Sequence, residues 1–297
     1  MAVAAQTSAA TSGPSTRETL LQIRKIVMYA VLIAFGAAMI FPFIFAVSSS
    51  FKTLPDIADN PAGIIPQPIT TEAYNSVLTS QQSNFPRWTF NSAFVAVVVT
   101  IGRVFFSSLA GYALARLNFP GKQAAFFTFL GTMMIPLIVL LVPRYIILTQ
   151  LGMTGTYQGI IVPMLVDAFG IFMMKQFFES IPREIEEAAF VDGAGRFVIF
   201  FRVILPMATP ALAALSIFAF QGAWNDFLNA LIVVISNRDL YTLPLGLAIL
   251  RGAQGNTLIW NQFFAGSVIT TLPMAIIFFA FQRYFVEGVN YSGLAGQ

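Results

Sequence analysis

Six apolar segments, each long enough to cross a lipid bilayer, constrain this chain more than any other feature. A membrane-spanning helix needs about 20 mostly apolar residues. Segments of this kind lie at 26–47, about 90–115, about 123–142, about 159–178, from near 203 to near 226, and about 262–285. Only 10% of the residues are charged and the mean hydropathy is +0.76, whereas soluble domains carry about 25% charged residues. We therefore predict an all-α, polytopic membrane protein with six transmembrane helices.

The residue types that are missing exclude several kinds of chemistry. The chain has neither Cys nor His, so it cannot form disulfides or thiolate metal sites, and it lacks the usual proton shuttle near neutral pH. It contains no G-x-x-x-x-G-K-[ST] phosphate-binding loop, and a formal net charge of +3 is too small to indicate nucleic-acid binding. We therefore do not expect this chain to be an enzyme, or to bind a cofactor or a metal ion.

The distribution of Lys and Arg predicts the side of the membrane on which each loop lies, because cytoplasmic loops are enriched in positive charge. With the N-terminus in the cytoplasm, ten of the 16 Lys and Arg residues lie on the cytoplasmic side and five lie outside. We therefore expect a multi-pass protein of the cell membrane (plasma or inner membrane), with both termini in the cytoplasm. The expected parts are a disordered tail at 1–24, a membrane domain at 25–288 and a second tail at 289–297.

The fifth apolar segment is longer than one span requires. It continues to Ile235, but the polar triplet Trp224-Asn225-Asp226 interrupts it. We predict a span that ends near this triplet, followed by a short external or re-entrant helix at 227–235. The alternative places 227–235 in a seventh span, although nine residues are too few to cross a bilayer alone.

A charged segment broken by glycine connects the fourth and fifth spans, at about 179–205. It begins with Pro182 and three glutamates, which are typical of a first helical turn, where acidic groups face the positive end of the helix dipole. Two glycines then permit a sharp turn, and a second helix follows with four apolar residues spaced to share one face. The residues are Glu184, Glu186 and Glu187, then Gly193 and Gly195, then Phe197, Phe200, Phe201 and Ile204.

Two interpretations of this segment are open. An amphipathic linker on the lipid headgroups would explain the phenylalanines. A docking site for a partner protein explains the acidic first helix better, because the anionic lipid of the cytoplasmic leaflet would repel it. It also explains why the two helices are separated by a glycine elbow.

The same segment resembles the EAA signature of the permease subunits of ATP-binding-cassette importers. The matching residues are Glu187-Ala188-Ala189, Asp192-Gly193-Ala194, Phe200, Ile204, Leu205-Pro206 and Pro210. The resemblance implies that the segment is a cytoplasmic coupling helix, which fits a groove on a separate ATPase subunit. The residues implied in this coupling are Glu187, Ala188, Ala189, Asp192, Gly193, Ala194, Phe197 and Phe200.

Within this family the chain looks most similar to carbohydrate permeases of the maltose-transporter type. The similarity rests on Trp224-Asn225-Asp226-Phe227 and on Phe285-Val286 followed by Gly288, although the C-terminal tail lacks the basic residue often found there. The resemblance implies four partners besides lipid: a second homologous permease subunit, two ATPase subunits and an extracytoplasmic solute-binding protein. Transport would then occur by alternating access.

Polar residues inside or beside the spans are the candidates for the substrate path. Arg103 heads a stripe of small or polar residues, Ser107, Gly111 and Ala115, spaced for close helix packing. A charge in the bilayer is expensive, so we expect Arg103 to pair with a carboxylate, and Asp167 of the fourth span is the candidate. Both could instead line the path.

Trp224, Asn225 and Asp226 combine an aromatic face with amide and carboxylate groups, as sugar sites do. The alternative is a Trp anchor at the membrane interface beside a solvated helix end. A different functional class is also open, an ion-coupled secondary transporter that uses Arg103, Asp167 and Asp226. The absence of a recognisable inverted repeat counts against this class.

Overall fold

The computed structural model describes residues 16–79, 84–252 and 259–293, and within these ranges all regular structure is helical. The bounds are α1 (Thr16–Ser50), α2 (Leu54–Asp59), α3 (Glu72–Thr79), α4 (Phe85–Arg116), α5 (Lys122–Met133), α6 (Leu141–Gln150), α7 (Tyr157–Ile161), α8 (Ala168–Ser180), α9 (Glu184–Val191), α10 (Arg196–Ile199), α11 (Leu205–Met207), α12 (Thr209–Trp224), α13 (Leu228–Val234), α14 (Leu243–Gly252) and α15 (Trp260–Gly293).

Short turns of other helix types join several of these elements. Three are 3-10 turns, at Leu137–Leu140, Val162–Met164 and Arg238–Leu240, and the fourth is a π-helical turn at Phe200–Ile204. The expected tail at 1–24 is helical from Thr16, and residues 1–15 lie outside the described residues. Of the expected tail at 289–297, residues up to Gly293 belong to α15 and the last four lie outside the described residues.

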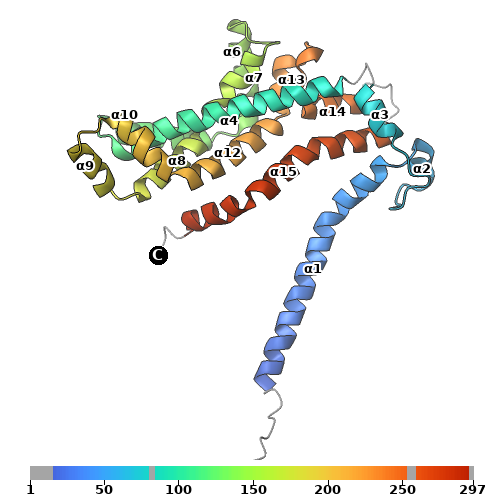
Figure 1. The fold of residues 1–297 in the computed structure, drawn as a ribbon. Helices are drawn as coiled ribbons and strands as arrows, with labels where there is room; N and C mark the ends of the chain where they lie inside the picture. The colour runs from blue at the N-terminus through green and yellow to red at the C-terminus, as the bar shows by residue number, and fades with distance from the viewer. Residues whose placement is uncertain (1–15, 80–83, 253–258, 294–297) are drawn as a thin grey trace, which may run out of the picture.

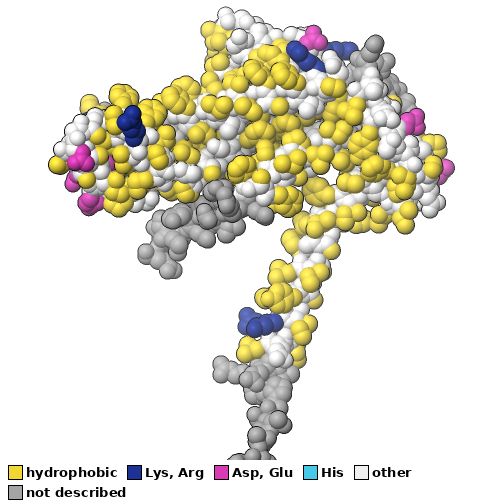
Figure 2. All heavy atoms as spheres, viewed as in Figure 1, with side chains coloured by type: hydrophobic (Ala, Val, Ile, Leu, Met, Phe, Trp, Pro, Cys, Tyr) yellow, Lys and Arg dark blue, Asp and Glu magenta, His cyan; other side chains and the backbone are white. Residues whose placement is uncertain are grey.

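The prediction of an all-helical, polytopic fold is confirmed, with four to six candidate spans in the described residues. Four stretches are long and apolar enough to cross a membrane, at Leu20–Ser50, Phe85–Arg116, Tyr157–Ser180 and Trp260–Phe281. The number is six if each of two bent helix pairs is one span: the pair from Lys122 to Gln150 turns by 95° and the pair from Arg196 to Trp224 turns by 79°. Hydrophobic side chains cover most of the visible face, and few charged side chains interrupt them (Figure 2).

The third span does not end where the sequence indicated. The expected range of about 123–142 stops inside a helix, because residues 141–144 form the first turn of α6. The chain turns at Pro136 instead, after the end of α5. Proline lacks an amide hydrogen and disfavours helix in the residue before it, so it can end one helix. It is tolerated in the first turn of the next helix, as Pro143 is.

The fifth span is bent near its start, and a short separate helix follows it, as the sequence predicted. The apolar run from Val203 belongs to the π-helical turn and α11, and the chain bends at Ala208 before α12 starts at Thr209. After Trp224 the chain forms the separate helix α13, which packs against α6 and α7. The seventh span is therefore ruled out.

Helix α1 leaves the rest of the molecule at a wide angle, and only its C-terminal part lies near α15 (Figure 1). Phe45 of α1 meets Phe264 of α15 edge to face, with ring centroids 6.0 Å apart. None of the most apolar stretch of α1 is buried within this chain. Lipid or another membrane protein must cover it.

Two separate hydrophobic cores follow one another along α4. The first core joins the first half of α4 to α7, α13, α14 and the end of α12, and includes Val99, Ile160, Trp224, Val233 and Leu245. The second core joins the other half of α4 to α8, α10, the π-helical turn and the start of α12, and includes Tyr112, Met174, Phe178, Ile204 and Leu215. Helices α9 and α10 lie at the second-core end of α4, and α3 lies at the other end (Figure 1).

The small stripe predicted on α4 brings α4 and α8 into close contact. A Cβ atom at Gly111 would lie 2.7 Å from Cβ of Met174 and 2.9 Å from the backbone nitrogen of Lys175. A Cβ atom at Gly170 would lie 2.5 Å from Oγ of Ser107. Backbones this close leave no room for side chains, so the packing of the second core depends on glycine here.

The close contact predicts that Gly111→Ala destabilises the protein, although alanine normally favours helices. The added methyl overpacks the α4–α8 contact, at a cost of about 1–3 kcal/mol. Gly36→Ala in α1 is the matched control, because nothing lies within 4 Å of its new Cβ atom. Thermal unfolding of the detergent-solubilised protein should shift downward for Gly111→Ala only. Equal unfolding temperatures for the two variants would contradict the packing account.

Candidate functional site

The predicted helix, glycine elbow and helix are all present. Helix α9 ends at Val191, and Gly193 follows with φ +84°, in the left-handed region that favours glycine. The amide of Gly193 donates to the carbonyl of Phe190 at 3.0 Å, and the amide of Ala194 donates to the carbonyl of Ala189 at 3.0 Å. This pair of bonds is a Schellman cap, which satisfies carbonyls that the helix end would leave free. Gly195 then precedes α10.

The elbow exposes a mixed acidic and apolar surface. Glu187, Ala188, Asp192 and Gly193 are exposed. Val191 is 88% exposed and Phe197 is 77% exposed, and Phe190 beside them is also exposed. Large apolar side chains this accessible beside carboxylates are typical of an interaction surface. Ala189 and Ala194 are half-buried and pack against the second core.

The expected single apolar face from Phe197 to Ile204 is wrong. Phe200 and Ile204 are buried in the second core, whereas Phe197 and Phe201 are exposed. The helix becomes π-helical at Phe200, so the spacing of an α-helix does not apply across this segment. Of the two phenylalanines implied in coupling, Phe197 is accessible to a partner, and Phe200 holds the segment on the core.

A buried ion pair fixes α9 to the end of α4. Nε of Arg116 lies 2.9 Å from Oε1 of Glu186, with the two side chains 4% and 11% exposed. The hydroxyl of Tyr112 donates to the other carboxylate oxygen at 3.3 Å. A terminal nitrogen of Arg116 also donates to the carbonyls of Phe178 and Ile181, at the end of α8. Arg116 thus ties α4, α8 and α9 together, and it positions the elbow.

Arg103 and Asp167 pair as the sequence predicted. Their closest nitrogen and oxygen atoms are 3.9 Å apart. Nε of Arg103 also donates to the carbonyl of Met164 at 3.0 Å. Asp167 does not lie inside a continuous helix, because the fourth span is broken at 165–167. Its carboxylate caps the start of α8 by accepting from the amide of Gly170 at 3.3 Å.

The cluster at the end of the fifth span differs from a sugar site in this structure. Trp224 is 2% exposed and stacks on Phe220, and its indole nitrogen donates to the carbonyl of Thr270 in α15 at 3.1 Å. The expectation that its ring faces a solute is therefore not met. The half-buried Asp226 accepts from the amide of Ala230 at 3.1 Å and so caps α13, whereas Asn225 is exposed.

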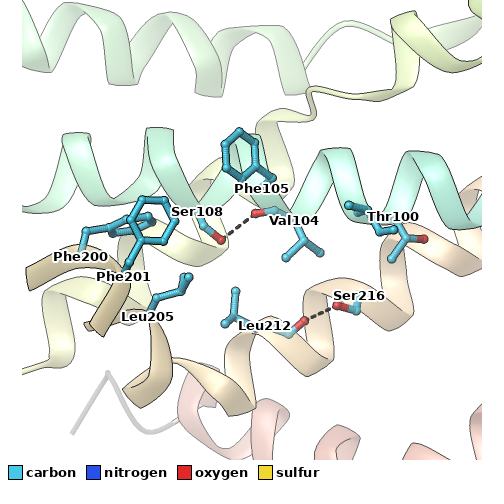
Figure 3. A pocket seen from close by; sticks show the side chains of 10 residues that line it. Thr100, Val104, Phe105, Ser108, Phe200, Phe201, Leu205, Leu212 and Ser216 are labelled. Carbon is cyan, nitrogen blue, oxygen red and sulfur yellow. Dashed lines mark hydrogen bonds between the residues drawn. The ribbon is translucent and has the colours of Figure 1, made fainter. Parts of the chain in front are cut away.

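A groove of about 310 Å³ lies between α4 and α12, beside the π-helical turn. Its three hydroxyl groups all donate to carbonyls of their own helices: Thr100 to Ala96, Ser108 to Val104 and Ser216 to Leu212. Figure 3 shows the last two of these bonds, with Phe200 and Phe201 closing one end. The remaining lining is apolar, so the groove has no free donors with which to bind a sugar.

Several polar side chains that hold the structure together were not singled out in the sequence. Asn91 is fully buried and donates to the carbonyls of Asp239 and Tyr241, while it accepts from the hydroxyl of Tyr157 at 2.6 Å. Asn229 is also buried and donates to the carbonyl of Ile160 at 3.1 Å. An Asn or Glu inside an apolar run was the available signal, because such a group must find a partner.

Glu186→Gln should destabilise the protein, because it leaves the buried charge of Arg116 without its counterion. Breaking a buried ion pair in this way costs about 3–5 kcal/mol. Glu187→Gln, one residue along the same helix, changes an exposed carboxylate and is the matched control. Thermal unfolding in detergent should separate the two variants clearly. The positioning role of Glu186 would be refuted by two variants that unfold together with the wild type.

Comparison with known proteins gives the family. Residues 103–291 match the family described as binding-protein-dependent transport system inner membrane component. The chain is 35% identical over 258 residues to the arabinooligosaccharides transport system permease protein AraQ of Halalkalibacterium halodurans, covering 86% of this chain and 91% of that one. It is 32% identical over 282 residues to the trehalose/maltose transport system permease protein MalG of Thermococcus litoralis, covering 93% and 100%.

The fold is also that of a solved transporter. A chain of a bacterial ABC transporter involved in the import of the acidic polysaccharide alginate superimposes with a TM-score of 0.82, and the match covers 93% of this chain and all of that one. The sequence identity is 24%, so this likeness establishes the arrangement of helices and no more. The family model and the two permeases show that the chain belongs to the inner membrane components of binding-protein-dependent transport systems, the multi-pass permease subunits of ABC importers.

Proposed function

We propose that this chain is one of two different permease subunits in an importer for sugars or oligosaccharides. Relatives named for their substrates include permeases for arabinooligosaccharides, trehalose or maltose, diacetylchitobiose and sulfoquinovosyl glycerol, which supports this substrate class. ATP hydrolysis takes place in partner subunits, and an extracytoplasmic protein delivers the solute. Membership of the importer family leaves no place for the alternative of an ion-coupled secondary transporter.

The observation that carries the proposal is the exposed elbow between α9 and α10. Its accessible carboxylates and apolar side chains lie on a segment that Arg116 and Phe200 anchor to the second core. A partner that pushes on the elbow therefore pushes on α4 and α8 as well. We assign this surface to the ATPase subunit, with Glu187, Asp192, Val191 and Phe197 as its contact residues.

The uncovered helix α1 supports a second permease subunit. Its apolar side chains have no cover within this chain for most of its length, and a neighbouring subunit in the membrane would bury part of it.

Asn225 and Asp226 are the side chains we propose for the substrate path, because Asn225 is exposed and Asp226 is half-buried where the fifth span ends. The partner permease would supply the other contacts.

Gly193→Val tests the role of the elbow. A branched side chain in the left-handed region costs roughly 1–2 kcal/mol in backbone strain, which would deform the elbow without touching the core, since nothing lies within 4 Å of the new Cβ atom. We expect normal insertion into the membrane and reduced co-purification of the ATPase subunit. Gly195→Val is the control, because its φ of −73° suits any residue and its Cβ position is also open.

The coupling role is contradicted if the Gly193→Val and Gly195→Val variants bind the ATPase subunit equally well. If Gly193→Val retains as much ATPase as Gly195→Val and the wild type, the shape of the elbow does not matter for docking. Co-purification from membranes, normalised to the amount of permease, gives the comparison.

Cysteine labelling tests the orientation that we propose, with both termini and the elbow in the cytoplasm. The chain has no native Cys, so a single introduced Cys is the only residue that the maleimide can label. Cys in place of Asn60, which is exposed between α2 and α3, should react with an impermeant maleimide from outside intact cells. Cys in place of Ser180, which is exposed at the end of α8 and lies outside the proposed ATPase contact, should react only after the cells are opened. The reverse pattern would overturn the orientation.

A further inference from the structure

The break in the fourth span lies where the two hydrophobic cores meet. The part before the break, α7 and its 3-10 turn, packs in the first core through Ile160 and Ile161. The part after it, α8, packs in the second core through Met174 and Phe178. The three residues between them, 165–167, are not helical. One apolar span thus contributes to two cores with an unwound joint between them.

Each core is held by its own polar contacts, which do not cross the joint. In the first core, Asn229 links α13 to α7, and Asn91 links α4 to the segment at 239–241. In the second core, Arg116 links α4 to α8 and α9. The break in the fourth span therefore lies between two cores, each with its own polar contacts, while α4 and α12 run through both cores.

Arg103 is the side chain that fills the joint. Its Nε donates to Met164, the last residue of the first-core part, at 3.0 Å, and its guanidinium lies 3.9 Å from the carboxylate of Asp167, which caps the second-core part. The same guanidinium borders α12, because a Cβ atom at Gly222 would lie 3.6 Å from it. Helix α4 also approaches the unwound residues closely, since a Cβ atom at Gly102 would collide with the side chain of Leu165.

We propose that Arg103 is a positioning residue that couples the two cores during transport. A free carbonyl and a carboxylate on opposite sides of one joint each interact with the same planar guanidinium, which presents several donors in fixed directions. A displacement of α8 that starts at α9 is then passed to α7 and α13 through Arg103 rather than absorbed at the unwound residues. This inference rests on the proposed function, in which an ATPase moves α9.

Paired spin labels on this chain test the coupling in the assembled transporter. Leu151→Cys reports on the first core, at the end of α6, and Ser180→Cys reports on the second, at the end of α8; both side chains are exposed. Pulsed electron resonance measures the distance between the labels without nucleotide and with ATP and vanadate. We expect a distance change in the otherwise wild-type complex.

Arg103→Met removes both contacts and keeps an unbranched apolar side chain in the joint. We expect the population with the ATP-induced distance to fall about tenfold, in the range of typical coupling between sites, while the ATPase subunits still co-purify. Asp167→Asn should cause part of the same loss, and combining it with Arg103→Met should add nothing. Arg103→Lys should show only part of the ATP-induced distance change, because an ammonium group lacks the planar arrangement of donors that a guanidinium presents.

Lys175→Met is the matched control. Lys175 is also a buried cation in this part of the fold, but its Nζ pairs with Glu179 at 2.7 Å and lies over the ring of Phe126 at 4.3 Å, all beside or within α8. Its loss should weaken the second core and leave the distance change intact. A full distance change in Arg103→Met, or an equal loss in Lys175→Met, overturns the inference.

The two proposals fail in different ways. A wild-type chain that co-purifies with ATPase subunits but shows no distance change would mean that the cores move as one body, which overturns the inference alone. A wild-type chain that binds no ATPase subunit overturns the proposed function, and the inference falls with it.

Discussion

Backbone carbonyls that helix breaks leave free are the constraint on which this structure depends. The hydrocarbon of a bilayer offers them no water, so each must be satisfied within the protein. The chain meets this need with a few buried or half-buried donors: Arg103, Arg116, Asn91 and Asn229. Each donates to carbonyls of a different segment, often more than 60 residues away in sequence. The breaks are therefore fixed joints rather than loose ones.

The two cores on either side of these breaks have different roles. The second core carries the elbow at α9 and α10, and the first carries the ends of the spans on the other side of the break. Arg116 holds the elbow on the second core, so a force on α9 is transmitted to α4 and α8 through this residue. Arg103 lies between the cores. The same chemistry that satisfies backbone groups thus provides the connections that a coupled transporter requires.

Local patterns in the sequence predicted the spans and the elbow. Hydropathy identifies a span without any knowledge of its neighbours, and the EAA residues with Gly193 indicated both the turn and its role. The bend in the third span was not predicted, because the sequence has a proline at both 136 and 143, and the structure places the turn at Pro136 and a helix through Pro143. The pairing of Arg103 with Asp167 was predicted because few charges were available in the spans.

Other features depended on partners distant in sequence. Glu186 and Glu187 are adjacent and alike, and only Arg116, 70 residues earlier, makes one structural and leaves the other exposed. Trp224 had the composition of a sugar site, yet the carbonyl of Thr270 accepts from its indole and the ring is buried.

Cross-linking from the elbow tests the central claim most directly. Val191 is 88% exposed beside Gly193, and a single Cys at this position can carry a short photoactivated cross-linker in a chain without other cysteines. In membranes that contain the whole importer, the account predicts a covalent product between this chain and the ATPase subunit. A product with lipid or with the second permease, and none with the ATPase, would contradict it.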